Sequence, residues 1–218
     1  MKNKSIIIDF DNTIGYFDQF IFLLNIIESV YKKKPLDKEE IYLLLDNFPF
    51  FFRPYIFDIF NIVINNKLNN KLNLFILYSC NGNEKFVKTI IDYIVIKCKI
   101  KLFDYTIFNK KNKKSIEEIK LICNTNLDIN ELFCFIDDKL YSNIKLKNYF
   151  VCLKYIFSYD IKDIIDNFPY DSFNKINKKI IKKYFKLRHC KIEEKQLPLY
   201  CYKLDTCNII NLVQDFLL

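Results

Sequence analysis

The sequence predicts an α/β fold built on a doubly wound parallel sheet. Three runs of consecutive apolar residues, at 6–8, 74–78 and 132–136, show no polar alternation, which is typical of strands buried on both faces of a parallel sheet. Segments with apolar residues at helical spacing separate them. Acidic or hydroxyl residues follow each run, at the sheet edge where open parallel sheets bind ligands.

Composition and charge are those of a globular protein. The chain has 218 residues, 51% of them hydrophobic and 17% aromatic, enough for one α/β domain with an insertion. Its formal charge of +8 favours an acidic or phosphorylated partner. The eight cysteines lack Cys-x-x-Cys spacing, which indicates neither a zinc nor a redox motif. We therefore expect reduced cysteines in an intracellular protein, cytoplasmic or nuclear, or inside a host cell if the sequence is viral.

Nothing in the sequence predicts contact with a membrane. The apolar run that follows the N-terminal lysines is too short for a signal peptide. No uncharged apolar stretch reaches the length of about 18 residues that a transmembrane helix needs.

The first predicted strand ends in two carboxylates. Asp9 and Asp11 follow it at spacing i, i+2, and carboxylates this close repel each other unless a cation lies with them. A hard ion with oxygen ligands, such as Mg²⁺, is the natural partner. A turn that merely caps a core strand is the alternative.

The segment 9–13, Asp-Phe-Asp-Asn-Thr, resembles motif I, Asp-x-Asp-x-Thr, of the haloacid dehalogenase superfamily of phosphotransferases. The resemblance implies that Asp9 is a nucleophile that forms an aspartyl-phosphate, and that Asp11 is the general acid and base. It also implies a Rossmannoid sheet with strand order 5-4-1-2-3.

Two helices are predicted directly after this motif. Apolar residues at helical spacing indicate a helix over 17–31, and Asp37 is placed to cap a second helix over 38–46. Residues 14–50 would then form a small helical insertion after the first strand. In the superfamily such an insertion is often a cap over the site, and two ordinary packed helices are the alternative.

The aromatic segment 50–60 contains Arg53 followed by Pro54, and proline is favoured in the first turn of a helix. This pair resembles the Arg-Pro-Gly segment of the RNA polymerase II carboxy-terminal-domain phosphatases and their nuclear-LIM-interactor-interacting-factor relatives, although no glycine follows here. A plain helix start with a surface arginine is the alternative. Residues 65–72 are predicted to be a polar loop.

The second strand, 74–78, ends at Ser79, and a helix is predicted over 84–97. This strand end resembles motif II of the superfamily and the Tyr-Thr-Ala-Ser segment of the same branch. The resemblance implies that Ser79, with the backbone N–H groups of Cys80 and Asn81, binds phosphate oxygens. A serine that only caps the helix would give the same pattern.

A third strand is predicted over 101–108, and a lysine-rich run leads from it into a helix over 116–123. Superfamily motif III is a lysine at such a helix start, whose ammonium neutralises the phosphoryl group and the nucleophilic carboxylate. Lys114 is the preferred candidate and Lys113 the second.

The strand 132–136 ends in Asp137 and Asp138, which resembles motif IV. By this resemblance, Mg²⁺ would be held by Asp9, the backbone carbonyl of Asp11 and Asp137, with Asp138 nearby. A fifth strand is predicted over 149–156.

The rest of the chain matches no motif. We expect a catalytic core over 1–156 and a helical, basic extension over 157–218 packed on it, with a last helix at 209–218. Within it, an amphipathic basic helix is predicted over 171–191. Residues 174–191 carry eight basic and no acidic residues, so this helix could bind the phosphate backbone of a nucleic acid. A solvated helical face is the commoner explanation, and His189 is given no catalytic role.

The predicted function is a Mg²⁺-dependent phosphomonoester hydrolase that acts through an aspartyl-phosphate. The Arg-Pro and Tyr-Ser segments favour a phosphoserine or phosphothreonine protein as substrate. The helical insertion suits superfamily members that act on small phosphoesters or nucleic-acid ends. A non-catalytic protein that binds nucleic acid or a transcription partner is the alternative from another class.

Overall fold

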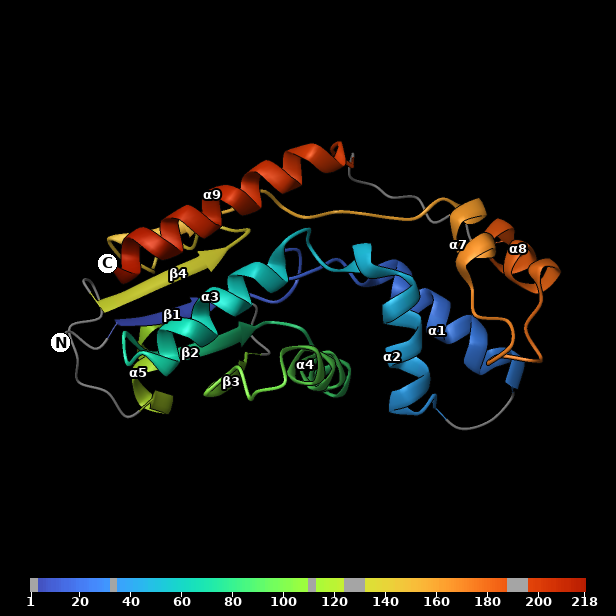
Figure 1. Cartoon of the computed structure of the whole chain (residues 1–218), viewed down its shortest axis with the longest axis horizontal. Helices are drawn as coiled ribbons and strands as arrows, with labels where there is room; N and C mark the ends of the chain where they lie inside the picture. The colour runs from blue at the N-terminus through green and yellow to red at the C-terminus, as the bar shows by residue number, and fades with distance from the viewer. Residues whose placement is uncertain (1–3, 32–34, 110–112, 124–131, 188–195) are drawn as a thin grey trace. The chain divides into compact units, whose positions relative to one another are not determined.

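The computed structural model describes residues 4–31, 35–109, 113–123, 132–187 and 196–218 (Figure 1). Its centre is a five-stranded, all-parallel sheet with the order β3-β2-β1-β4-β5, which confirms the predicted α/β class and strand order. The strands are β1 (Lys4–Ile8), β2 (Leu72–Ser79), β3 (Tyr105–Phe108), β4 (Phe133–Asp137) and β5 (Asn148–Val151). The helices are α1 (Asp18–Tyr31), α2 (Lys38–Asn47), the 3-10 turn η1 (Pro49–Phe51), α3 (Ile56–Leu68), α4 (Glu84–Cys98), α5 (Ile116–Cys123), α7 (Ile161–Asn167), α8 (Lys178–Leu187) and α9 (Leu199–Leu217).

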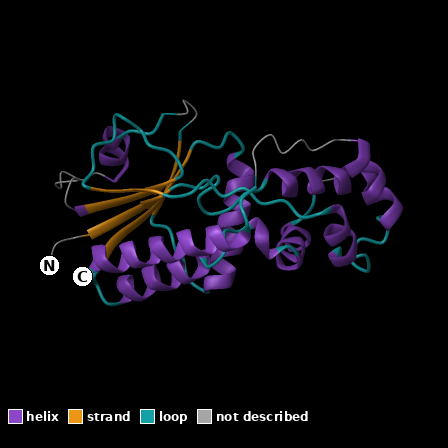
Figure 2. Ribbon diagram, turned by 90° about the horizontal axis from the view of Figure 1, so that it is seen from above, coloured by secondary structure: helices purple, strands orange, loops and turns teal. Residues whose placement is uncertain are grey.

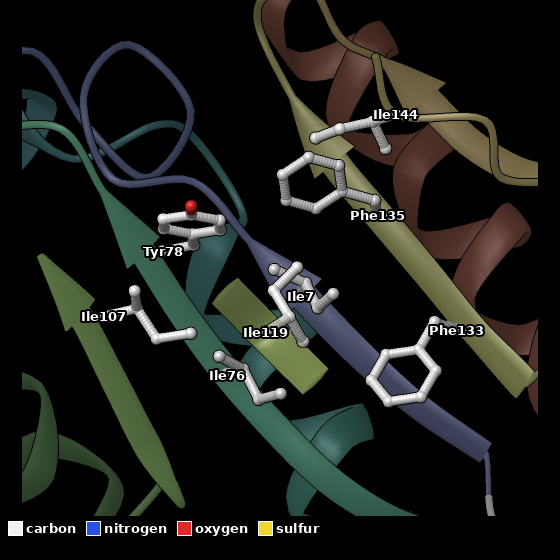
Figure 3. Packing of buried hydrophobic residues seen from close by; sticks show 8 residues of the cluster. All are labelled: Ile7, Ile76, Tyr78, Ile107, Ile119, Phe133, Phe135 and Ile144. Carbon is white, nitrogen blue, oxygen red and sulfur yellow. The ribbon is translucent and has the colours of Figure 1, made fainter. Parts of the chain in front are cut away.

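Helices cover both faces of the sheet, as an unbroken apolar strand requires. On one face, Ile119 of α5 packs with Ile7 and Tyr78 in the cluster shown in Figure 3. On the other, Phe60 of α3 lies against Phe75 of β2, with ring centroids 6.4 Å apart. The helices α3 and α9 contact each other along this second face (Figure 2). The sheet is therefore doubly wound.

The strand register brings the polar strand ends to one edge. Ile8 pairs with Leu77 of β2 on one side and with Ile136 of β4 on the other. The residues that follow these three positions are therefore level with each other across the sheet. They include Asp9 and Asp137, which are separated by most of the chain in sequence.

Internal contacts divide the chain into two compact units. The sheet unit comprises Met1–Gly15, Arg53–Tyr155 and Pro198–Leu218, and the helical unit comprises Tyr16–Phe52 and Ile156–Leu197. The helical unit thus combines most of the predicted insertion with the segment that follows β5. The last helix, α9, belongs to the sheet unit.

Within the helical unit, reciprocal hydrogen bonds join its two chain segments. The side-chain amide of Gln19 donates to the backbone oxygen of Tyr159 at 2.9 Å and accepts from its N–H at 2.8 Å. The Tyr159 ring also packs edge-on against Phe48 and Phe51. At the predicted start of α2, Asp37 and Glu40 form a complete capping box.

Several predicted boundaries are wrong, because tertiary partners decide where elements end. The first half of the predicted loop 65–72 is helix, since α3 continues to Leu68, and Lys67 is held by Asp104 at 2.7 Å. The last helix begins at Leu199, ten residues before 209. β5 ends at Val151: the Cys152 N–H still donates to the Asp137 carbonyl of β4, but the Leu153 N–H donates to Asp205 instead.

The helix of the basic segment begins later than the predicted position 171. α8 spans Lys178–Leu187, and residues 188–191 of the predicted range, His189 included, lie outside the described residues. Over the parts of the chain that the structure describes, no helix has both the length and the apolar composition needed to cross a bilayer.

Candidate functional site

Three aspartates meet at the carboxyl edge of the sheet. Asp9 follows β1, Asp137 ends β4, and Asp138 comes next. Each offers a carboxylate oxygen, and these oxygens lie within 4.8 Å of one another. Asp9 is 5% exposed and Asp137 is fully buried, so water can screen their mutual repulsion only weakly.

Lys114 partly compensates this buried charge. Its ammonium, on a side chain 1% exposed, donates to Asp9 Oδ1 and, at 2.7 Å, to Asp137 Oδ2. Of the two lysines that the sequence left open, this is the one in the site, because Lys113 is exposed. The ammonium also lies 5.5 to 5.7 Å from the ring centroids of three aromatic residues. They are Tyr78, Phe135 and Tyr141.

The donor set suits a divalent, oxygen-seeking cation. Three carboxylates and the Lys114 ammonium leave two negative charges uncompensated within this group. The buried Oδ2 of Asp138 has no hydrogen-bond partner, which is costly unless another ligand satisfies it. All available donors are oxygens, as Mg²⁺ prefers. Asp9, Asp137 and Asp138 are therefore the residues that would hold the ion.

Burial shifts the pKa values of all three acids upward. Burial raises the pKa of Asp9 to about 6; Lys114 opposes this increase and Asp137 adds to it. Burial also raises the pKa values of Asp137 and Asp138. In contrast, the two carboxylates raise the pKa of Lys114 despite its burial, so the ammonium stays charged. Without a metal ion, the group therefore binds protons more readily than exposed aspartates do.

Asp11, the second aspartate after β1, is not part of this three-carboxylate group. Asp11 is only half-buried, and its Oδ1 accepts a hydrogen bond of 2.8 Å from the side-chain amide of Asn81. This bond links the loop after β1 to the loop after β2. A role for Asp11 as a metal ligand through its backbone carbonyl stays a prediction.

The predicted phosphate-binding residues lie at the end of β2. Ser79 is fully buried, and its hydroxyl accepts from the Asn81 N–H at 3.0 Å. That N–H is therefore already paired, and a phosphate oxygen would have to compete for it, whereas the Ser79 hydroxyl hydrogen can be donated. Cys80 is half-buried, and burial raises the pKa of its thiol, so it is not an activated nucleophile. α4 begins only at Glu84, with Asn83 as its cap.

Sequence reasoning missed the group that holds Lys114 in position. The Tyr78 hydroxyl donates to Glu118 and accepts the Ser115 N–H at 3.0 Å. Asn109 donates to the same Glu118 carboxylate at 2.6 Å. These bonds attach the start of α5, and hence Lys114, to β2. Burial, together with the hydrogen bond to Glu118, raises the pKa of Tyr78 to about 12, so the hydroxyl keeps its proton.

Sequence reasoning also left the position of Arg53 open. The structure shows that the surface alternative is wrong, because Arg53 is 1% exposed and forms an ion pair of 2.8 Å with Asp205 of α9. The Arg-Pro pair after an aromatic run was the available signal. Nothing local indicated a carboxylate 152 positions away.

Comparisons with known proteins reveal only weak similarities to this chain. No family model and no curated protein matches it. Among solved structures, a Thermotoga maritima protein assigned as a beta-phosphoglucomutase is similar at 12% identity and a TM-score of 0.41, over 84% of this chain and 99% of that one. Fcp1, an essential RNA polymerase II CTD phosphatase, is similar at 15% identity and a TM-score of 0.44, over 99% of this chain and 63% of that one. Similarities this weak assign neither family nor function, so we base the functional proposal on the site itself.

Proposed function

We propose that this protein is a Mg²⁺-dependent phosphomonoester hydrolase that works through an aspartyl-phosphate on Asp9. One observation carries the proposal: the Asp9 carboxylate contacts the buried Lys114 ammonium and lies with Asp137 and Asp138 at the carboxyl edge of a parallel sheet. A carboxylate nucleophile can attack a phosphate only where cations neutralise the negative charge of both reactants. The lysine and the metal-binding acids supply that condition.

The reaction would run in two displacements. An Asp9 oxygen attacks phosphorus in line, the bond from phosphorus to the ester oxygen breaks, and Asp11 gives its proton to the leaving alcohol. Asp11 then takes a proton from a water molecule that attacks phosphorus and releases inorganic phosphate and Asp9. A bound Mg²⁺ would neutralise charge on the transferring phosphoryl group.

The remaining residues would position the phosphoryl group. Lys114 already donates to Asp9 and would share its three N–H donors with a phosphoryl oxygen. The buried Ser79 hydroxyl lies at the neighbouring strand end and would donate to another. For the natural substrate we favour a phosphoserine or phosphothreonine protein, on the resemblance of the Arg-Pro and Tyr-Ser segments.

The first test is hydrolysis of para-nitrophenyl phosphate by the purified protein. We expect phosphate release that requires Mg²⁺ and stops when EDTA is added, because the three aspartates provide the metal ligands. EDTA followed by excess Mg²⁺ is the control and should restore the rate. Hydrolysis that continues undiminished in EDTA would contradict the proposal.

The lysine face of α8 supports a second candidate function, nucleic-acid binding. Lysines 178, 179, 182, 183 and 186 of α8 are all exposed, as is Lys175 just before the helix, whereas Ile181 and Phe185 on the opposite side are buried. Phe185 packs against Phe22 of α1 at 5.0 Å, which fixes this orientation of α8. The positive face is therefore presented by tertiary packing, and phosphate backbones are complementary to it.

Substitution of four α8 lysines tests this function. With Lys178, Lys179, Lys182 and Lys183 all changed to Gln, we expect weaker binding of a labelled single-stranded oligonucleotide in fluorescence anisotropy. The slope of log K against the logarithm of the salt concentration should become about 3 less negative. Each lysine contact to a phosphate of a single strand contributes about 0.7 to this slope, and four contacts are removed. The matched control changes four exposed lysines of the sheet unit, Lys71, Lys88, Lys97 and Lys99, to Gln. An equal loss in both variants would show only a net-charge effect.

A further inference from the structure

We propose that the C-terminal helix α9 is part of the catalytic apparatus, because its Asp205 fixes Arg53 as a positioning residue for the loop that carries Asp11. We call Arg53, its partner Asp205 and the backbone oxygens that Arg53 binds the clamp. The kinetic consequence of this clamp rests on the proposed hydrolase function. The clamp itself rests only on contacts within the sheet unit.

The Arg53 guanidinium joins three segments that are distant in sequence. Its Nε donates to the backbone oxygen of Thr13 at 2.6 Å, and one terminal nitrogen donates to that of Asn12 at 2.9 Å. The same nitrogen donates to the backbone oxygen of Leu153, and the other donates to Asp205 at 2.8 Å. A planar fork of N–H donors can satisfy all these acceptors at once, which an ammonium group cannot do.

The loop held in this way contains a left-handed backbone turn. Asn12 has φ of 60°, in the left-handed region that asparagine tolerates better than most other non-glycine residues. Its N–H donates to Gly15 at 2.8 Å, and its carbonyl accepts both from Arg53 and from the Tyr155 N–H. The clamp therefore restrains the residue directly after Asp11.

The same network reaches Asp9 through Thr13. The Thr13 side chain forms a hydrogen bond with the Asp9 carboxylate, and its hydroxyl oxygen lies 3.8 Å from Cys152 Sγ. Arg53 holds the Thr13 carbonyl and also contacts that sulfur at 3.7 Å. Both catalytic aspartates are thus linked to one buried cation by a short chain of contacts.

Asp205 neutralises the buried charge of Arg53. Arg53 is a fully buried positive charge, which requires an ionic partner. The Asp205 oxygen that receives Arg53 also accepts the Leu153 N–H at 3.1 Å, so one carboxylate orients both sides of the clamp. Below the guanidinium, the Tyr155 ring packs edge-on against Tyr202 of α9 at 4.8 Å.

The test compares Asp205→Ala with Asp205→Asn in the whole 218-residue chain. Alanine removes the acceptor, so we expect kcat for para-nitrophenyl phosphate to fall about 100-fold through misplacement of the loop, with KM nearly unchanged. Asparagine keeps an oxygen acceptor for both hydrogen bonds and should restore much of kcat. Asp215→Ala is the matched control on an exposed part of the same helix, and it should behave like the wild type.

A second measurement does not depend on activity. Hydrogen exchange should be faster across residues 10–15 in Asp205→Ala, where the Asn12 and Ile14 amides are hydrogen-bonded in the wild type. Exchange across α4 should not change.

The outcomes separate the two proposals. All rates are measured well below each variant's melting temperature, where a purely structural ion pair would leave kcat unchanged. Wild-type kcat in Asp205→Ala, or unaltered exchange across 10–15, would overturn the clamp. If the wild type releases no phosphate, the hydrolase proposal fails and the exchange experiment alone decides on the clamp.

Discussion

Replacing Asp9 with Asn is expected to lower kcat by at least about 10⁴-fold, the scale observed when one member of a catalytic group is removed. The amide is not a nucleophile toward phosphorus at neutral pH, so the first displacement cannot occur. Lys114 would remain paired with Asp137, so binding of the phosphoryl group should be affected far less than turnover.

The same substitution should leave the protein folded. Asn has nearly the size of Asp, and the substitution removes one of three acids that repel each other. The carboxylate that is removed is costly to bury, since burial raises the pKa of Asp9 to about 6. In the absence of Mg²⁺ and at neutral pH, we therefore expect a melting temperature equal to or above that of the wild type.

The measurement is phosphate release together with thermal unfolding of the same samples. Asp58→Asn, at an exposed position on α3, is the matched control and should match the wild type in both. Full activity in a folded Asp9→Asn protein would refute the assignment of the nucleophile.

Replacing Lys114 with Met is expected to affect both stability and turnover. It removes the ammonium that pairs with Asp9 and Asp137 while keeping a side chain of similar length. Removing one partner of a buried ion pair costs about 3–5 kcal/mol of unfolding free energy. Turnover should fall as well, because the ammonium that contacts the Asp9 nucleophile would be lost and could no longer neutralise it or the phosphoryl group.

The loss of stability should depend on pH in a defined direction. Lys114 lowers the pKa of Asp9, so without it that pKa rises further above its ordinary value of 3.8. An acid with a raised pKa in the folded state binds its proton more tightly when folded. It therefore adds stability at low pH, and this contribution is lost as the pH rises through the folded pKa. The difference between wild type and Lys114→Met should thus be larger at pH 8 than at pH 5.

Thermal unfolding at these two pH values, in EDTA, checks this expectation. Lys113→Met is the matched control. It removes the same charge from the neighbouring residue, which is exposed. A Lys114→Met protein that is equally destabilised at both pH values would show that coupling to the aspartates is not the cause.

Local sequence pattern was sufficient to predict the buried strands and the polar residues that follow them. Unbroken apolar runs indicated buried parallel strands, and Asp9, Asp11, Ser79 and Asp137 stood where those strands end. Because parallel strands present their carboxyl ends at one edge, these residues could be expected to meet without knowledge of the packing. The structure places Asp9 and Asp137 together at that edge, with Ser79 at the end of the neighbouring strand.

Packing of the folded chain selects which of several chemically equivalent residues lies in the site. Lys113 and Lys114 are chemically identical neighbours, and packing against β2 and β4 selects the one that is buried. Likewise, Arg53 can be buried because its charge is paired with Asp205, which lies 152 residues further along the chain. Local periodicity carries no information on such pairings, because their energy comes from desolvation and ion pairing that exist only once the chain has folded.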